Sequence, residues 1–480
     1  MAVLGIDLGT SAVKALVLDE QGAILSVAKA DYAVLAPHPG WAESNPQKWW
    51  TATISAVQAA LAQMPQFTTI TTIGLAGQMH GVVLTAKDGQ PLRDALLWPD
   101  TRAEKELELY KGLATSTLLR LANPLVPGMA GPMLCWLAQH EAATYQASRW
   151  ALQPKDWLRL CLTDTIATDP SDASATLLYD LPADQWADDV IAALGLEREL
   201  FPPILPSGAV AGTLSVQAAT TMGLSPGLPV AVGAADTAAA ILGTGLFEPG
   251  LIQLTLGTGA QLVQLQAQPV ADASGNTHLY RAAEPNNWYG MAAVQNAGLA
   301  LDWVRRTLRV SWEELYASAA WGSPGAEGLV FRPYLTRERT HYQATSSGGA
   351  FLGLRIHHQP EHLWRAALEG VACGIRLALE ALPGASRATA LRLAGGGSVH
   401  PAWRQLLCNL LNRELVILDT PAASSRGAAL LGGIAAGIWP NARATSPLTP
   451  LTSTIVTPDS KQAALYAQVY TNYLNHLTRL

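Results

Sequence analysis

Two copies of one short pattern, Leu-Gly-Thr between apolar runs, lie near the beginnings of the two halves of this chain. The first copy is residues 8–10, between the apolar runs 3–8 and 12–18, and the second is residues 256–258 within LTLGTGAQLVQL. Each copy is predicted to be a β-hairpin with a polar turn between two buried strands. A unit repeated in this way favours two similar halves that face each other across one ligand.

The length of 480 residues is too great for a single hydrophobic core. We therefore expect an α/β protein of two domains, residues 1–240 and 241–480. Hydrophobic residues make up 49% of the chain and charged residues only 14%, so both cores can be large. The net charge of −6 gives no general affinity for nucleic acid or for acidic membranes.

The sequence also bears on cellular location. Asp7 interrupts the first apolar run, so no N-terminal signal is expected, and no run reaches the roughly 18 apolar residues of a membrane span. The four cysteines lack Cys-x-x-Cys spacing and have apolar neighbours, which favours buried, reduced thiols. A cytoplasmic protein is the expectation.

The turn of the first copy has the composition of a phosphate cradle. Its glycine lets backbone N–H groups approach an anion, Thr10 and Ser11 add hydroxyl donors, and Asp7 can hold a Mg²⁺ that shields phosphate charge. The second copy has Thr255 where the first has Asp7. This difference predicts a site for the metal and for phosphoryl transfer in the first half, and a turn that only binds phosphate in the second. Ordinary turns without a ligand are the alternative.

Two further segments place candidate ligand-binding residues where predicted strands end. Met79 and His80 lie in GQMHG after the strand 71–75, at a position where ligands usually meet a sheet. Asp100 and Arg102, in LLWPDTRAE, follow another apolar strand and are suited to hydrogen-bonding sugar hydroxyls. A structural histidine and a helix cap with an ordinary salt bridge are the alternatives.

Asp236 is the candidate for the chemical step. It follows the apolar strand 228–234 and precedes an alanine-rich helix, just ahead of the second hairpin. A helix cap is the alternative, but a carboxylate opposite a nucleotide γ-phosphate is what deprotonation of an attacking hydroxyl requires. By contrast, the polar segment that contains Asp169, Ser171 and Asp172 is interpreted as structural or capping.

A glycine-rich turn separates a strand from a helix late in the chain. Gly395, Gly396, Gly397 and Ser398 allow the backbone to approach a flat ligand or a phosphate, although many α/β proteins contain such turns without a ligand. Further on, the small residues of ASSRGAALLGGIAAG predict a tightly packed helix without chemistry of its own.

Together these motifs resemble one known family. GIDLGTSAVK, GQMHG, WPDTR, QPKDWLRL, LTLGTG, PYLTRERT and LAGGGS follow one another along nearly the whole chain, as in the FGGY family of carbohydrate kinases, and most closely in its branch that acts on xylulose. The resemblance implies two actin-like ATPase (ribonuclease-H-like) domains, with ATP·Mg²⁺ and a sugar in the cleft between them.

The resemblance also implies roles for individual residues. Asp236 corresponds to the catalytic base, which also contacts the sugar, and Asp7 to the metal-associated carboxylate. The other implied residues are Met79, His80, Asp100 and Arg102 for the substrate, and Thr10, Ser11, Lys14, Gly257, Thr258, Gly259, Gly395, Gly396, Gly397 and Ser398 for the nucleotide. The chain departs from the family pattern at Met133, Thr237, Gln295, Asn296, Arg337 and His341.

The expected activity is ATP-dependent phosphorylation of the terminal hydroxyl of a ketopentose, D-xylulose at its 5-position, in pentose catabolism. The phosphate motifs match the family pattern, whereas the departures fall on the sugar side. D-ribulose, another pentulose or a polyol therefore stay open as substrates, and a non-catalytic protein that senses nucleotide or sugar is the alternative of another class. Whether two copies form a homodimer also stays open.

Overall fold

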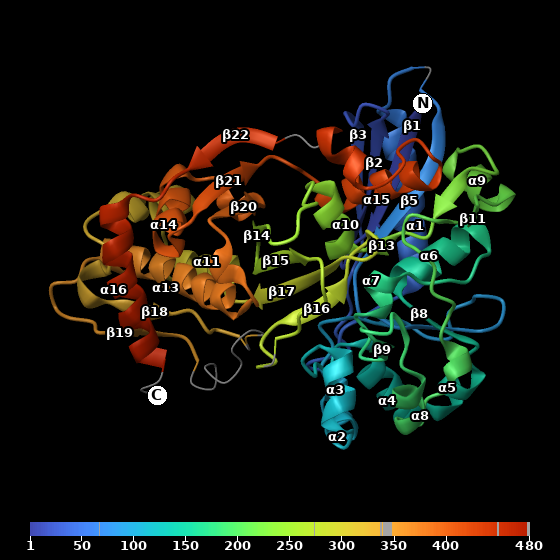
Figure 1. Ribbon diagram of the computed structural model, residues 1–480, viewed down its shortest axis with the longest axis horizontal. Helices are drawn as coiled ribbons and strands as arrows, with labels where there is room; N and C mark the ends of the chain where they lie inside the picture. The colour runs from blue at the N-terminus through green and yellow to red at the C-terminus, as the bar shows by residue number, and fades with distance from the viewer. Residues whose placement is uncertain (67, 273, 337, 339–347, 449–450, 478–480) are drawn as a thin grey trace.

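The computed structural model describes residues 1–66, 68–272, 274–336, 338, 348–448 and 451–477, and it has two lobes side by side (Figure 1). Within these residues each lobe contains one seven-stranded sheet. The first sheet consists of β1 (Ala2–Leu8), β2 (Ala12–Asp19), β3 (Ile24–Asp31), β5 (Ile70–Gly77), β11 (Val210–Thr213), β12 (Pro229–Ala231) and β13 (Ala234–Ala235). The second consists of β14 (Ile252–Leu256), β15 (Ala260–Gln266), β16 (His278–Arg281), β17 (Trp288–Val294), β20 (Ala390–Ala394), β21 (Glu414–Leu418) and β22 (Leu451–Val456).

The two sheets share one topology. The order β11-β12-β5-β1-β2-β3 in the first corresponds to β22-β21-β20-β14-β15-β17 in the second. In both, the second, third and fourth strands of this series are parallel, and every other neighbouring pair is antiparallel. The two Leu-Gly-Thr patterns lie at the ends of the equivalent strands β1 and β14, which confirms the predicted duplication.

Helices and small two-stranded sheets complete the lobes. The first lobe contains α1 (Pro46–Ala62), α2 (Leu107–Lys111), α3 (Thr115–Leu121), α4 (Ala130–His140), α5 (Ala142–Ala147), α6 (Pro154–Thr163), α7 (Pro170–Ala173), α8 (Asp188–Ala193), α9 (Val216–Met222) and α10 (Asp236–Gly243). Later helices are α11 (Gly298–Leu308), α12 (Trp312–Ala317), α13 (Pro360–Ala381), α14 (Pro401–Leu411), α15 (Ala423–Ala435) and α16 (Ser460–Leu477). The small sheets pair β4 (Glu43–Ser44) with β7 (Ala95–Leu96), β6 (Val83–Thr85) with β8 (Trp150–Leu152), β9 (Tyr179–Asp180) with β10 (Gln185–Trp186), and β18 (Val330–Arg332) with β19 (Ala350–Leu352). In the described part of the chain, no helix has the length and apolar character needed to cross a bilayer.

The strand expected over residues 228–234 is divided in the structure. β12 ends at Ala231, and the two-residue β13 begins at Ala234. Gly233 between them has a φ of +84°, a left-handed conformation that breaks an extended strand. The chain therefore bends just before Asp236.

Helix α15 belongs to the C-terminal half of the sequence but packs on the first sheet, where its red ribbon lies beside the blue strands of Figure 1. The contact is backbone to backbone: a Cβ atom at Gly74 of β5 would lie 1.7 Å from the carbonyl oxygen of Ala428. A Cβ at Gly427 would lie 1.8 Å from the carbonyl oxygen of Ala239 in α10. The predicted small-residue helix thus packs tightly, and the expected boundary at residue 240 lies inside α10.

Candidate active site

Asp7 and Asp236 come together where the parallel strands β1, β5 and β13 end. Asp7 of β1 lies opposite Ala76 of β5, and Ala234 of β13 lies opposite the same residue from the other side. Asp236 follows two residues later, at the first position of α10. The charge of Asp236 raises the pKa of Asp7, which agrees with the position of the two residues at neighbouring strand ends.

Burial controls the protonation of both groups. Burial, followed by the charge of Asp236, raises the pKa of Asp7 to about 7. Burial also raises the pKa of Asp236 to about 6, against the opposing effect of hydrogen bonds from Thr237. The backbone N–H of Thr237 donates to Asp236 Oδ1 at 2.6 Å, and its hydroxyl donates to the same atom at 3.2 Å. At neutral pH, Asp236 is therefore an ionised carboxylate of raised basicity, the state that accepts a proton.

The surroundings of Asp7 suit a cation. Its Oδ1 atom is buried and has no hydrogen-bond partner among the described residues. Lys14 lies opposite Asp7 in the β1–β2 hairpin, and both Lys14 and Ser425 of α15 oppose the rise in the pKa of Asp7. The described residues contain no group of three or more His, Cys, Asp or Glu side chains that could hold a metal. This arrangement fits Mg²⁺, which often takes one or two carboxylates and completes its ligands with phosphates and water.

The first glycine turn lies directly beside Asp7. The N–H of Gly9 donates to the carbonyl oxygen of Ala12 at 3.0 Å, which closes the turn. Trp98 Nε1 donates to the Thr10 hydroxyl at 2.9 Å, whereas Ser11 is exposed. The turn therefore presents one fixed and one exposed hydroxyl next to the carboxylate.

The second glycine turn borders a cavity of about 810 Å³ in the second lobe. Gly257 and Thr258 line it from the turn, and Gly396 and Gly397 line it from the segment between β20 and α14. Four residues predicted to bind nucleotide, from two distant places in the sequence, thus meet at one cavity. Its volume is in the range of small-molecule and cofactor sites.

Glycines fix the shape of the backbone around this cavity. Gly395 has a φ of +96°, and a Cβ atom there would lie 2.2 Å from the carbonyl oxygen of Leu256. A Cβ atom at Gly259 would lie 2.9 Å from the carbonyl oxygen of Val294. Ser398 is buried, and its hydroxyl donates to the carbonyl oxygen of Gly395 at 2.7 Å. These residues therefore hold the two loops together, and Gly396 and Gly397 face the cavity.

Aromatic rings at the same cavity were not predicted from the sequence. The rings of Trp312 and Tyr316 on α12 are stacked with centroids 5.4 Å apart, and His400 stacks on Tyr316 at 5.7 Å. All three residues line the cavity. The signal was the spacing of Trp312 and Tyr316, which puts two aromatic rings on one helix face.

Met79 and His80 are buried against the second sheet. The Tyr289 hydroxyl of β17 donates to Met79 Sδ at 3.7 Å, and the ring of Tyr280 on β16 lies 5.9 Å from the His80 ring. His80 Nδ1 is 2.7 Å from the carbonyl oxygen of Ala175, and its φ is 71°. A non-glycine residue in this conformation is uncommon and often found at functional sites. Residues of both lobes thus surround the GQMHG segment.

Asp100 and Arg102 make most of their contacts inside the protein. Asp100 accepts the backbone N–H of Ala42 at 2.7 Å and Nε of Arg102 at 2.9 Å. Arg102 forms an ion pair with Glu43 at 2.6 Å, and its guanidinium lies 3.6 Å from the centre of the Trp41 ring. Arg102 Nη1 is buried without a hydrogen-bond partner in the described part of the chain.

One departure from the family pattern connects two loops of the second lobe. The Asn296 side chain donates to Glu338 Oε2 at 3.0 Å and accepts the N–H of Thr336 at 2.9 Å. The backbone N–H of Gln295 donates to Glu338 Oε1 at 2.6 Å. These bonds hold Thr336 and Glu338 against the turn between β17 and α11.

The other departures have different surroundings. Met133 is fully buried in the first-lobe core, where an apolar residue is suitable. Gln261 of β15 donates to the Thr237 hydroxyl at 3.3 Å, so Thr237 links Asp236 to the second lobe, a contact that was not predicted. Arg337 and His341 lie outside the described residues.

Comparisons with known proteins show the family of the chain and solved structures with the same fold. Residues 2–243 match the N-terminal domain of the FGGY family of carbohydrate kinases, and residues 252–436 match its C-terminal domain. A xylulose kinase of Klebsiella pneumoniae is 34% identical, over 86% of this chain and 85% of its own. A gluconokinase of Bacillus licheniformis is 28% identical, over 91% of this chain and 88% of its own. A crystal structure of a xyloylose kinase from Brucella ovis has a TM-score of 0.91 and 33% identity, and covers 99% of this chain and 98% of its own. The chain therefore belongs to the FGGY family of carbohydrate kinases.

Proposed function

We propose that this protein transfers the γ-phosphoryl group of ATP to D-xylulose and forms D-xylulose 5-phosphate. The shared site of the two carboxyl groups carries the proposal. Asp7 precedes the first glycine turn, and Asp236 is linked through Thr237 to Gln261, two residues beyond the second turn. The similarity to xylulose kinases over almost the whole chain supports this sugar.

In the proposed reaction Asp236 is the general base. Its carboxylate accepts the proton from the terminal sugar hydroxyl as that oxygen forms a bond to the γ-phosphorus. The bond between the γ-phosphorus and the β–γ bridging oxygen breaks, and ADP leaves. The raised pKa of about 6 for Asp236 suits this role, because a base works best when its pKa is near the working pH.

The residues around the second turn would hold the nucleotide. The cavity is lined by Gly257, Thr258, Gly396 and Gly397, and its aromatic wall offers a face for the base of the nucleotide. We assign Thr10, Ser11 and Lys14 to the phosphates because they lie in the hairpin beside Asp7. Asp7 would hold Mg²⁺, which neutralises charge on the β- and γ-phosphates when bound. Gly259, Gly395 and Ser398 support the loops.

The sugar would bind near Met79 and His80. His80 has the backbone strain found at functional sites, and the Tyr289 hydroxyl contacts the neighbouring Met79. Asp100 and Arg102 are assigned a lower rank as sugar ligands, since their contacts with Glu43, Ala42 and Trp41 already use most of their hydrogen-bonding groups.

A second candidate substrate is another pentulose such as D-ribulose, a polyol or gluconate. Thr237 favours a substrate other than D-xylulose, because the resemblance places an amide side chain at this position in xylulokinases, next to the catalytic Asp236. The 28% identity to a gluconokinase points the same way.

The test of the proposed function is Asp236→Asn. The variant is expected to bind ATP normally and to lose sugar-dependent ADP formation by about 10²-fold or more, the scale at which general bases contribute. Near-normal turnover would remove Asp236 from the base role.

The cellular setting is also a proposal. All four cysteines are free thiols, which supports a reducing compartment such as the cytoplasm. A homodimer stays a proposal that a mass measurement in solution would test.

A further inference from the structure

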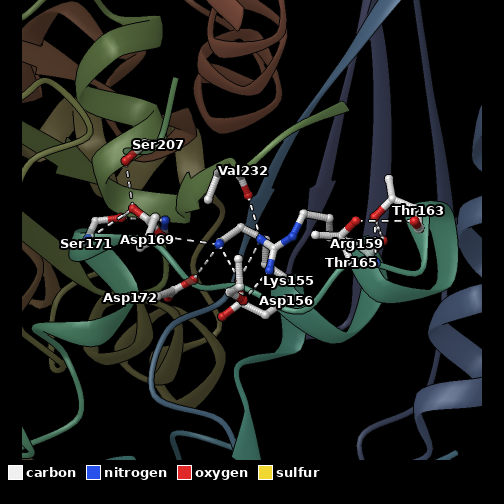
Figure 2. A network of polar contacts seen from close by, with 12 residues as sticks. Lys155, Asp156, Arg159, Thr163, Thr165, Asp169, Ser171, Asp172, Ser207 and Val232 are labelled. Carbon is white, nitrogen blue, oxygen red and sulfur yellow. Dashed lines mark hydrogen bonds and ion pairs between the residues drawn. The ribbon is translucent and has the colours of Figure 1, made fainter. Parts of the chain in front are cut away.

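Five ionisable side chains form a fully buried network in the first lobe (Figure 2). Lys155 of α6 forms ion pairs with Asp156 at 2.6 Å, Asp169 at 3.2 Å and Asp172 at 3.3 Å. Arg159 adds a second cation 2.9 Å from Asp156. Buried charges are costly unless their partners are held in place, so the geometry of this network is closely specified.

The network contacts the chain just before β13, the strand that leads to Asp236, and again at the last residue of this strand. Arg159 Nη1 donates to the carbonyl oxygen of Val232 at 2.8 Å, before the strand. The Ser171 hydroxyl accepts the backbone N–H of Ala235 at 2.9 Å, immediately before Asp236. Figure 2 shows the first of these contacts together with Ser171 and its bond to the acidic residues.

Ser171 joins this network to the residue that precedes the proposed base. Its hydroxyl donates to Asp169 Oδ2 at 2.5 Å, and Asp169 is paired with Lys155. One hydroxyl thus connects the buried ion pairs to the backbone N–H of Ala235, the residue before Asp236.

β13 needs such support because its own structure is weak. It has only two residues, and it follows Gly233, whose backbone is left-handed. Ala235 is the N-cap residue of α10 and has no side chain that could cap the helix. The position of Asp236 therefore depends on contacts from outside its own strand and helix.

The turn that follows Ser171 also reaches the sugar segment and the second lobe. The carbonyl oxygen of Ala175 lies 2.7 Å from His80 Nδ1. The Ser174 hydroxyl accepts the N–H of Arg281 in β16 at 2.9 Å. One short segment thus contacts the peptide before the proposed base, a proposed sugar ligand and the opposite sheet.

We propose that Ser171 is a positioning residue for phosphoryl transfer: its hydroxyl ties the buried Lys155–Asp169 pair to Ala235 and so fixes the carboxylate of Asp236 against the sugar hydroxyl. This inference rests on the proposed role of Asp236 as the base. The interpretation of Asp169, Ser171 and Asp172 as structural or capping is confirmed for Asp169, which caps α7. The positioning role of Ser171 is proposed in addition to it.

Ser207 provides a matched control within the same network. Its hydroxyl donates to the same Asp169 Oδ2 atom at 2.8 Å, as Figure 2 shows. Ser207→Ala and Ser171→Ala therefore each remove one hydroxyl from Asp169, but only Ser171→Ala removes the bond to Ala235.

The experiment compares kcat, KM for the sugar and the pH profile of these variants in the full-length protein. Ser171→Ala is expected to lower kcat about 10- to 100-fold, the effect of a small misplacement of a reacting group, with a smaller change in KM. The acidic limb of the pH profile of kcat is expected to move in this variant, because a less restrained Asp236 carboxylate is more hydrated. Ser207→Ala is expected to keep kcat within about twofold and the limb in place, because the bond between Ser171 and Ala235 stays intact.

A third variant covers the case in which Ser171→Ala folds poorly. Ser171→Cys keeps a group of similar size with weaker hydrogen bonding and is expected to give an intermediate kcat. Equal kcat and equal pH profiles for the Ser171 and Ser207 variants would overturn the positioning role. The result for Asp236→Asn is interpreted separately. If Asp236→Asn turns over normally, the proposed function fails. If Asp236→Asn is inactive and the Ser171 and Ser207 variants have equal kcat and equal pH profiles, only this inference is overturned.

Discussion

Replacing Asp7 by Asn should stabilise the protein at neutral pH while it abolishes turnover. The folded state raises the pKa of Asp7 from its ordinary value of 3.8 to about 7, so folding disfavours the ionised form. A raised pKa in an acid means that the native state holds a proton which the unfolded chain has lost. Stability is therefore highest below the ordinary pKa and falls as the pH rises to the folded value.

The size of the effect follows from the two pKa values. They differ by about 3 pH units, and each unit corresponds to ~1.4 kcal/mol, so the cost of ionised Asp7 reaches about 4 kcal/mol above pH 7 as an upper limit. Asparagine has nearly the same shape and no charge. The gain in unfolding free energy of the variant should therefore be near zero at about pH 4 and grow across the range from about pH 4 to about pH 7.

The assay is denaturant or thermal unfolding of the wild type and of Asp7→Asn at several pH values, without nucleotide or Mg²⁺. Asp88→Asn, at an exposed acid, is the control for the loss of a negative charge and should change stability little at any pH. Addition of Mg²⁺ and ATP should reduce the advantage of Asp7→Asn, because both bind the wild type better. An Asp7→Asn variant that is equally stable or less stable than the wild type at pH 8 would contradict the raised pKa of Asp7.

Two further predictions follow from contacts around the site. Thr237→Val removes the hydroxyl that lowers the pKa of Asp236, so the acidic limb of kcat should move to a pH above about 6, and a pH–rate profile with an unmoved limb would contradict this. Gly74→Ala places a Cβ atom 1.7 Å from the carbonyl oxygen of Ala428 and should lower stability by about 1–3 kcal/mol or more in thermal unfolding. Gly112→Ala, where the nearest atom would be 3.4 Å away, is its control, and equal melting temperatures for the two variants would exclude the close contact of α15 with β5.

The hairpins and the strand ends were predictable because their signals are local. The apolar runs on both sides of residues 8–10 and 256–258 specify strands, and a glycine turn between them has few other structures available. Asp7 lies within one such strand and Asp236 follows another, so their positions at strand ends could be read directly. The short strand β13 was less predictable, because the effect of Gly233 depends on its backbone conformation.

Contacts between distant segments could not be predicted in this way. The small residues of α15 indicated close packing but not that the partner is β5 in the first half of the sequence, more than half the chain away. The contact of Gln261 with Thr237 and that of Ser171 with Ala235 likewise join residues whose proximity only the folded chain creates. Asp100 and Arg102 have the residue types of sugar ligands, but their burial beside Trp41 and Glu43 is a tertiary property.

The most direct test of the proposed D-xylulose kinase activity is ADP formation by the wild-type protein with ATP, Mg²⁺ and a panel of D-xylulose, D-ribulose, glycerol and gluconate. We expect the highest kcat/KM with D-xylulose and a product phosphorylated at the 5-position. A preference for glycerol or gluconate, or ADP formation that no sugar stimulates, would contradict this activity.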